Sequence, residues 1–530
     1  MRRMSRRNAL AAGLGLGGSL AGVRMLASAD VLRAVAAAGQ PKRGGTLAAA
    51  AEVDPVSLDP HTNSNFSAAQ GFEHVYESLT GYDEKNQIVP MLAQQWEISN
   101  GGRTYLFHLR PNVKFHNGQL MTADDVKYSI DRVLDPKTAS PWRGWFDSID
   151  EIKVVDPLTV QMNLNAPYPG LLGSFAGMRA SGIIPKGLAE KENLNLKAVG
   201  TGPFRLVEYV PQDHLTYARH PDYWDKPLPY LDGMTFKVLT EESARLAALR
   251  AGQIQYAYIS AQGAEQLKGA SGFTVLSTTV ANVTLHYINV SKKPLSDWRV
   301  RKAMRMAVDT SEVIRKAAYG AAVPSGPIPT GYGDWYLDPK TLPFVRPDVE
   351  GARKLLAEAG YPNGGFKVEI KCSPQYPEYV ATSLVVQDSL KNLGIDAQVV
   401  QMEWGAFVKD HATELKSGGK EGGEIFCSGN TFRPDPDGYI YPYFHTGGVL
   451  NDGGYTNPRL DPLMLQARSI FNHDQRRSLY SQIQRTLLEE SPNWWWHVKF
   501  NIEALSVRLM GYSQSFTGRR FLLKKAWLSS

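Results

Sequence analysis

Trp96–Pro136 reads WEISNGGRTYLFHLRPNVKFHNGQLMTADDVKYSIDRVLDP, and the first part of this stretch predicts a β-hairpin. Tyr105, Phe107 and Leu109 alternate with more polar residues, which is the pattern of a strand with one buried face. The Asn-Gly pair at 100–101 has the composition of a turn between two strands. We therefore expect two paired strands whose alternate side chains enter a core.

The second part of the same stretch predicts a capped helix. Thr122 is followed three residues later by Asp125, a spacing that lets the two residues bond each other's backbone in the first turn. One apolar stripe recurs at the helical period and comprises Val126, Ile130, Val133 and Leu134. Pro136 ends the helix, because the residue before a proline is disfavoured in the helical conformation.

The second half of the chain predicts a parallel sheet. After helical stripes at 300–308 and 349–359, the order from Phe366 is strand, helix at 380–393, strand at 395–402 and strand at 424–427. Strands that alternate with helices pair in parallel, and a ligand crevice lies at their carboxyl ends. The fold class is therefore α/β. The final stretch, 494–530, reads as strands that return to the first body, so two chain crossings between lobes would form a hinge.

The N-terminus has the composition of an export signal. Residues 1–7 carry four arginines and no acid, an apolar run follows at 10–23, and Ala27–Ala29 offers a cleavage site. The sequence SRRNAL at Ser5–Leu10 is similar to the twin-arginine motif of proteins exported in the folded state. Ala36–Ala38 is a second cleavage candidate. A retained membrane anchor is the alternative, although a spanning helix needs about 20 apolar residues.

Charge and size exclude some classes. The net charge is +6, but residues 1–29 hold five arginines and no acid, so the remainder carries about +1. Nothing in this balance indicates a nucleic-acid surface. The pattern GxGxxG at 13–18 lies inside the export signal and so does not indicate a dinucleotide site. A mature chain of about 490 residues exceeds a single core, and we expect at least two domains.

Two cysteines are too few for a disulfide framework. Cys372 and Cys427 each end a short apolar run. If these runs are neighbouring parallel strands, both thiols lie on one rim of the sheet. An oxidising compartment permits a disulfide there, and two free, buried thiols are the alternative.

Nine separated strings carry a resemblance to a known family. They are GGTL at Gly44, SLDPH at Ser57, VYESL at Val75, the Trp96–Pro136 stretch, VGTGPF at Val199, DWRVRKAMRMAVD at Asp297, ARKLLAEAGYPNGG at Ala352, DPDGY at Asp435 and GGYTNPRLD at Gly453. Together they resemble the extracytoplasmic solute-binding proteins, family 5, that feed oligopeptide, dipeptide and nickel ABC importers. The resemblance runs from Gly44 nearly to the C-terminus.

The resemblance implies a two-lobed periplasmic-binding-protein-like type II fold in its large (cluster C) form. The core of the first lobe would comprise 44–81, 198–288 and 492–530, with an inserted subdomain at 82–197, and the second lobe would comprise 289–491. It also implies an ABC permease and ATPase complex as partner, a monomeric carrier outside the cytoplasmic membrane, and no cofactor.

Two departures from the family bear on the ligand. The aspartate that pairs with a peptide ammonium in the dipeptide and oligopeptide binders would fall at Phe432, and the arginine that grips a dipeptide carboxylate would fall near Pro374. A peptide with two charged ends would lose two charge-assisted bonds, each of about 2–3 kcal/mol. An ordinary dipeptide is therefore not the expected ligand.

Several candidate ligand contacts lie in the second half of the chain. Trp404 is where family members place a cleft aromatic, and a core anchor is its alternative role. Arg433, in the segment Asn430–Asp435, would hold an anionic or hydroxyl-rich ligand if it faces the cleft. Otherwise it would pair with Asp435 or Asp437 on the surface. Asp435 itself is expected to cap the turn before Pro436. Asn430 and Phe432 flank Arg433 and are included as candidates.

Other candidates lie in the first half. Trp142 and Trp145 flank Arg143 in a loop, and exposed aromatics beside an arginine suit stacking on a planar or sugar ring, with packing against a helix as the alternative. Asn63 follows the SLDPH loop at the lobe edge. The consecutive tryptophans at 494–496 are expected to form a buried strand near the lobe junction.

Other classes fit less well. The chain has no Gly-x-Ser-x-Gly or His-Glu-x-x-His motif, so a hydrolase is disfavoured. It has no clustered His or Cys residues at metal spacing, yet a nickel or metal-chelate carrier of the same family stays open, since a chelator can supply the ligands. A peptide-handling chaperone or receptor subunit also stays open. We expect a binding protein, not an enzyme, for a peptide-like, opine-like or oligosaccharide solute.

Overall fold

The computed structural model describes residues 40–63, 69, 71–177, 180–417, 424–451 and 453–529. The export motif at 5–10 and both cleavage candidates lie outside these residues. Within them, no helix combines the length and apolar character that crossing a membrane would require.

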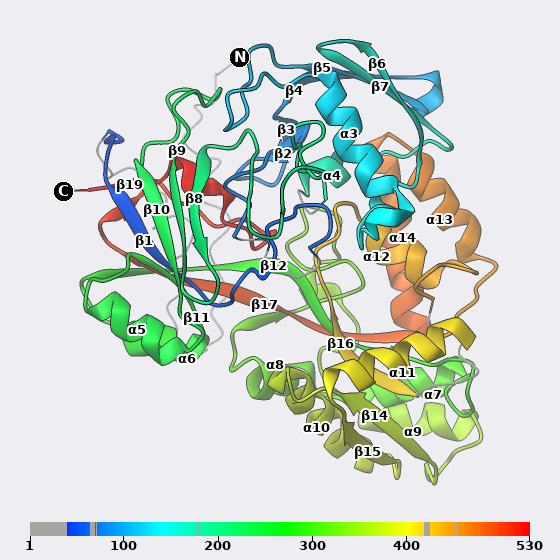
Figure 1. Ribbon diagram of the computed structural model, residues 1–530. Coiled ribbons are helices and arrows are strands. Elements are labelled where there is room, and N and C mark those ends of the chain that lie inside the picture. The colour runs from blue at the N-terminus through cyan, green and yellow to red at the C-terminus, as the bar shows by residue number, and fades with distance from the viewer. Residues whose placement is uncertain are drawn as a thin grey trace, which may run out of the picture. The chain divides into compact units, whose positions relative to one another are not determined.

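One large sheet contains strands from both predicted lobes (Figure 1). Its strands are β1 (Thr46–Ala51), β8 (Phe204–Val210), β9 (His214–Arg219), β10 (Gly233–Val238), β11 (Tyr256–Ile259), β12 (Phe273–Ile288), β13 (Ala322–Pro324), β14 (Lys367–Cys372), β15 (Asp396–Gln401), β16 (Ile425–Asn430) and β17 (Asn493–Ser506). The order is β15-β14-β16-β12-β17-β11-β1-β10-β9-β8, and β13 pairs with β17. The predicted parallel pairing of β14 with β15 and with β16 is confirmed.

Two long strands, β12 and β17, lie at the middle of the large sheet. They pair antiparallel with each other from Phe273 to Tyr287, while β12 also pairs with β16, predicted for the second lobe, and β17 with β11, predicted for the first. Their register shifts between Thr279 and Val283 and again between Thr284 and Leu285. Such irregularities bend and twist a strand pair locally.

A separate small sheet contains the predicted hairpin. It has the order β4-β5-β7-β6, with bounds β4 (Ala93–Ser99), β5 (Thr104–Leu109), β6 (Ile149–Asp156) and β7 (Thr159–Leu164). Tyr105, Phe107 and Leu109 are buried as predicted. Two short pairs complete the strands, β2 (Thr80–Tyr82) with β3 (Ile88–Pro90) and β18 (Leu509–Met510) with β19 (Trp527–Leu528). The lobe boundaries at 82, 197, 289 and 491 stay a prediction.

Helices cover both lobes (Figure 1). They are α3 (Ala123–Leu134), α4 (Leu171–Ala176), α5 (Glu242–Arg250), α6 (Ala261–Leu267), α7 (Trp298–Met306), α8 (Thr310–Ala317), α9 (Val349–Glu358), α10 (Pro377–Lys391), α11 (Trp404–Ser417), α12 (Asp437–Phe444), α13 (Leu460–Ser469) and α14 (His473–Glu490). The predicted capping box of Thr122 and Asp125 is present on α3. The stripe residues Val126, Ile130 and Val133 pack into the core of the small sheet.

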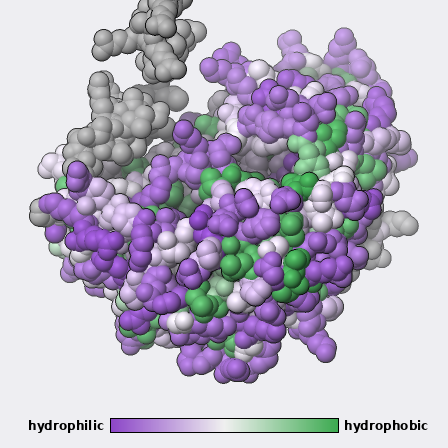
Figure 2. Space-filling view, turned by 90° about the horizontal axis from the view of Figure 1, so that it is seen from above, coloured by the Kyte–Doolittle hydropathy of each residue, from purple (hydrophilic) through white to green (hydrophobic). Residues whose placement is uncertain are grey.

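The three consecutive tryptophans of β17 are buried, as predicted. Because successive side chains of a strand point to opposite faces, Trp494 and Trp496 enter the second-lobe core and Trp495 enters the core on the other face. The indole Nε1 of Trp496 donates to Nδ1 of His286 over 2.7 Å. The surface seen from above in Figure 2 is mainly hydrophilic, with hydrophobic groups interspersed, as is usual for a protein surface.

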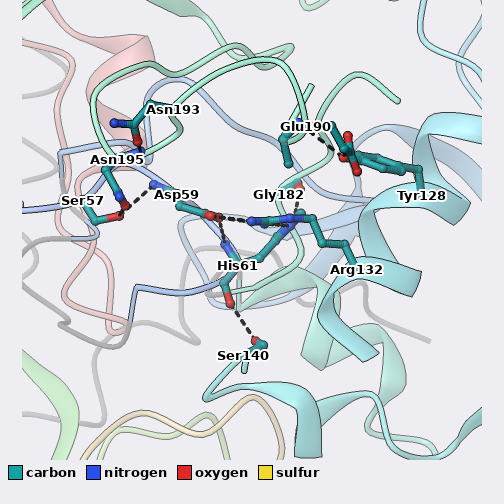
Figure 3. A network of polar contacts seen from close by, with 11 residues as sticks. Ser57, Asp59, His61, Tyr128, Arg132, Ser140, Gly182, Glu190, Asn193 and Asn195 are labelled. Carbon is teal, nitrogen blue, oxygen red and sulfur yellow. Dashed lines mark hydrogen bonds and ion pairs between the residues drawn. The ribbon is translucent and has the colours of Figure 1, made fainter. Parts of the chain in front are cut away.

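A buried polar network ties the SLDPH loop to α3 (Figure 3). Arg132 donates from both terminal nitrogens to Asp59, over 2.9 and 2.6 Å, and from Nη1 to Nδ1 of His61 over 2.8 Å. His61 in turn donates from Nε2 to the Gly182 carbonyl over 2.8 Å. Burial and the Arg132 charge lower the pKa of His61 to about 4, so the ring is neutral at pH 7. Burial opposes the Asp59 charge, but Arg132 outweighs it and lowers the pKa of Asp59.

Replacing Arg132 should loosen α3 from the first lobe. We expect Arg132→Met to lower the free energy of unfolding by about 2 kcal/mol, because Asp59 is left without its bidentate partner. Lys127→Met is the control on the same helix, since Lys127 pairs with Asp131 at an exposed position and should change stability by less than about 0.5 kcal/mol. Denaturant unfolding measures both, and equal effects would contradict the role given to Arg132.

Candidate ligand site between the lobes

An aromatic cluster lies where the lobes meet, and Phe432 is its centre. This cluster, here called the aromatic junction, consists of Tyr82, Trp145, Tyr332, Phe432 and Phe516. The Phe432 ring lies 5.6 Å from Phe516, 6.2 Å from Tyr82, 6.3 Å from Tyr332 and 6.4 Å from Trp145, between ring centroids. These residues come from distant parts of the chain, so the junction forms only in the folded protein. Phe432 follows β16, at the carboxyl end of a parallel strand, where such sheets place ligands.

Arg433 lies beside the junction and forms no ion pair with a described carboxylate. Its Nη2 donates to the hydroxyl of Tyr443 over 2.7 Å, and its backbone N–H donates to the hydroxyl of Tyr439 over 2.9 Å. Its carbonyl accepts from the hydroxyl of Tyr332 over 2.9 Å. The side chain is partly buried. A guanidinium that bonds a single tyrosine hydroxyl keeps its remaining donors available for an anion.

The acidic residues near Arg433 are engaged by other arginines, so the predicted surface pairing of Arg433 with Asp435 or Asp437 is wrong. Asp435 accepts from both terminal nitrogens of Arg476, over 2.8 and 2.5 Å, and Asp437 lies 3.5 Å from Arg468. Two parallel hydrogen bonds from the Arg476 guanidinium hold the carboxylate more strongly than a single hydrogen bond would. Asp435 also accepts from the backbone N–H of Asp437 over 2.8 Å, the predicted turn cap. Burial raises the pKa of Asp437 to about 6, and neighbouring Arg468 opposes this.

A row of aromatic rings links Arg433 to Trp404 along the second lobe. Tyr443 stacks on Tyr287 with 6.0 Å between ring centroids, Tyr287 lies 5.2 Å from His411, and Trp404 stacks on Phe407 at 5.4 Å. His411 and Phe407 are 6.3 Å apart. The row uses β12, α11 and α12. Trp404 and Arg433 therefore lie at opposite ends of one surface instead of touching each other. Trp404 is partly buried and also contacts Tyr376 at 5.1 Å.

The remaining candidates are buried side chains. For Trp142 the packing alternative holds: it is 8% exposed in the core of the small sheet, where its indole Nε1 donates to the Asn63 carbonyl over 2.9 Å. The Asn63 amide donates to the Ser57 carbonyl over 2.7 Å and so fixes the SLDPH loop. Asn430 is buried and accepts from the Tyr443 hydroxyl over 3.4 Å. Among these candidates, the structure brings Trp145, Phe432, Arg433 and Asn430 close to one another.

Three tyrosines of this region were missed by reasoning from the sequence, namely Tyr287, Tyr332 and Tyr443. Tyr443 lies ten residues after Arg433, and the turn at 434–436 folds α12 back so that the two side chains meet. No short motif marks them. A signal was present only in the number of aromatic residues in the segment YIYPYFH at 439–445.

The cysteines lie side by side beneath this surface. Cys372 ends β14, whereas β16 continues three residues past Cys427, so only one of the two predicted strand ends is observed. Both thiols are free and buried against Tyr379. Burial raises the pKa of both thiols, so they are protonated at neutral pH. In the part of the chain that the structure describes, no three His, Cys, Asp or Glu residues are placed to hold a metal ion.

Comparisons with known proteins agree on one family. Residues 87–451 match the model of the bacterial extracellular solute-binding proteins, family 5 Middle. A glutathione-binding protein of Pectobacterium atrosepticum is 30% identical over 468 residues, which cover 86% of this chain and 89% of that protein. The structure of AgaA from A. tumefaciens R10 in complex with agropinic acid is 26% identical, covers 92% of this chain and 99% of its own, and has a TM-score of 0.76. HbpA2 from Haemophilus parasuis is 26% identical with a TM-score of 0.81, covering 92% and 100%.

Proposed function

Because this chain belongs to family 5 of the bacterial extracellular solute-binding proteins, the substrate-binding components of ABC importers, we propose that it captures a small anionic organic solute between its lobes. Peptide-like and opine-like compounds with a free carboxylate fit this description. The observation that carries the proposal is Arg433, a partly buried guanidinium at the lobe junction whose side chain bonds a tyrosine hydroxyl and no described carboxylate.

The charges around Arg433 support an anion and disfavour a cation. A ligand ammonium would need a carboxylate, and those nearest to Arg433 in the sequence, Asp435 and Asp437, already face Arg476 and Arg468. Phe432 adds an apolar ring beside Arg433 instead of an acceptor. A carboxylate from the ligand would complete the guanidinium fork through two parallel hydrogen bonds. The relatives named for glutathione and for agropinic acid bind small organic compounds.

The aromatic row supports a ligand with a flat or ring-shaped part. Tyr287 and Trp404 are only partly buried, and aromatic rings of this kind stack on planar groups and on sugars. An oligosaccharide would use the same rings, but it would leave the Arg433 charge without a partner anion. Trp145, Phe432, Asn430, Asp435, Trp142 and Asn63 would act mainly by shaping and holding the junction.

The mechanism is binding and closure. The ligand must bind the closed form of the two lobes in preference to the open form, since only a differential affinity shifts a conformational equilibrium. The ABC permease would then recognise the closed, ligand-bound form. No bond of the solute is made or broken, in keeping with a family of binding proteins.

We also propose that the protein is exported by the twin-arginine route and acts as a monomer outside the cytoplasmic membrane. The support is the sequence SRRNAL at 5–10 followed by an apolar run and a small-residue cleavage site. N-terminal sequencing of the exported protein would distinguish cleavage near 29 from cleavage near 38.

Replacing Arg433 should remove the charge selectivity. The test is calorimetry with glutathione, agropinic acid, an oligosaccharide and nickel with histidine, together with mass spectrometry of what co-purifies. We expect an anionic compound to bind, and Arg433→Met to weaken it about 30-fold, or about 2 kcal/mol, because a charge-assisted bidentate contact is lost. Arg433→Lys should recover part of the affinity.

Arg143→Met is the matched control, because Arg143 is an exposed arginine next to Trp142 and Trp145. It should bind as the wild type does. Tight binding of a neutral oligosaccharide that Arg433→Met leaves unchanged would overturn the proposal.

A further inference from the structure

The turn of the β4–β5 hairpin contains two glycines with different surroundings. Both Gly101 and Gly102 have positive φ, +62° and +90°, which favours glycine at each. A Cβ built on Gly101 would meet nothing within 4 Å. A Cβ built on Gly102 would lie 2.2 Å from Cε2 of Phe471 and 2.6 Å from its Cζ. Gly102 is therefore required for packing as well as for backbone conformation.

Phe471 belongs to the second lobe. It lies in the short connection between α13 and α14, which Figure 1 shows next to the small sheet. The connection is anchored, because the Asn472 side chain accepts from the backbone N–H of Gln475 and caps α14. Phe471 nevertheless remains 41% exposed. The Phe471 ring is exposed and touches a glycine of the small sheet. We therefore regard this as a contact between the second lobe and the small sheet, and not as part of a hydrophobic core.

Further contacts follow the same boundary nearer the aromatic junction. A Cβ on Gly173 of α4 would lie 2.2 Å from the Pro434 carbonyl oxygen, and the Tyr82 hydroxyl donates to that oxygen over 3.2 Å. These contacts adjoin Arg433. The Gly102–Phe471 contact involves none of the candidate ligand residues, so it can be altered without changing the ligand site.

We infer that the Gly102–Phe471 contact is a closure contact, which sets how far the second lobe can approach the small sheet. This inference rests on the proposed function, since it concerns closure around a ligand. A side chain at 102 must displace the ring or hold the bodies apart. The backbone strain at 102 is present whether the lobes are open or closed, whereas the clash exists only when they are closed. A bulky residue at 102 therefore shifts the equilibrium towards the open form.

Cross-linking tests the contact without any ligand. Gly102→Cys with Phe471→Cys, in a chain carrying Cys372→Ser and Cys427→Ser, should form a disulfide with copper phenanthroline at least tenfold faster than Gly101→Cys with Phe471→Cys. Equal rates would show that the glycine and the ring do not meet in solution. Because no ligand is involved, this result is independent of whether an anion binds Arg433.

Small-angle scattering tests the role in closure, with the compound that calorimetry shows to bind, because the ligand-bound protein is the form that closes. Gly102→Leu should have a larger radius of gyration than Gly101→Leu, which also places a side chain at positive φ but without the clash. Adding Phe471→Ala to Gly102→Leu should return the radius to the Gly101→Leu value. If Gly102→Leu and Gly101→Leu scatter alike, Phe471 simply turns aside and the closure role is overturned.

Discussion

Arg476→Met is expected to lower the free energy of unfolding by about 3–5 kcal/mol, because removing one partner of a buried ion pair leaves the other charge without compensation. The Arg476 and Asp435 side chains are 5% and 9% exposed. Arg476 also donates from Nε to the Ala467 carbonyl over 2.8 Å, so the variant loses a link between α14 and α13 as well. Denaturant unfolding monitored by tryptophan fluorescence measures the change.

The adjacent residue supplies the control. Arg477 pairs with Asp334 at 3.2 Å, but both side chains are about half exposed, so Arg477→Met should cost less than about 1 kcal/mol. Combining Arg476→Met with Asp435→Asn should cost less than the sum of the single changes, because the unpaired charge is then gone. Additive costs would mean that the two side chains stabilise the fold independently.

His497→Phe is expected to make the protein more resistant to acid. His497 is fully buried in β17, and burial lowers the pKa of its ring to about 3. Neither ring nitrogen has a hydrogen-bond partner in the described part of the chain, so an apolar ring of similar size removes no contact. The unfolded chain takes up a proton near pH 6.5, whereas the folded chain does so only near pH 3. Stability due to neutral His497 is therefore full above pH 6.5 and is lost as the pH falls through this window.

The size of the effect follows from linkage, at about 1.4 kcal/mol per pH unit. Relative to the wild type, His497→Phe should gain about 2 kcal/mol on going from pH 7 to pH 5 and about 3 kcal/mol at pH 4. Val498→Ala is the control, because this buried neighbour of His497 on β17 carries no titratable group and should lower stability equally at every pH. Parallel stability curves for wild type and His497→Phe would refute the argument.

Local signals predicted much of the fold. Alternation in β5, the glycine-containing turn and the Thr122–Asp125 capping box all depend on residues within a few positions, so the hairpin and α3 were predicted correctly. The order of elements after Phe366 predicted the parallel pairing. The partnership of β12 with β17 could not be predicted in this way, because Leu285 and Trp495 meet across about 210 residues of sequence.

The site was predicted less completely, because its contacts also join residues that are far apart in the sequence. The partner of Asp435 is Arg476, 41 residues away, and local reasoning favoured the nearer Arg433 instead. Trp142 is buried, and its indole N–H donates to the carbonyl of Asn63, which lies 79 residues earlier in the sequence. The partners of charged side chains and indoles are set by which residues lie nearby in the folded protein. The sequence therefore identified Arg433 and Phe432 as unusual, but it did not show which groups surround them.

The position of β17 has a consequence for biosynthesis. This strand occupies 493–506, and it pairs with β11 of the first lobe, with β12 at the crossing and with β13. Until β17 has been translated, β11 and β12 each have an edge with unpaired backbone N–H and C=O groups. The strands on the two sides of β17 therefore cannot yet join into one sheet. We therefore expect the nascent chain to need protection from aggregation until its last segment emerges, and to acquire native structure as a whole after translation instead of lobe by lobe during it.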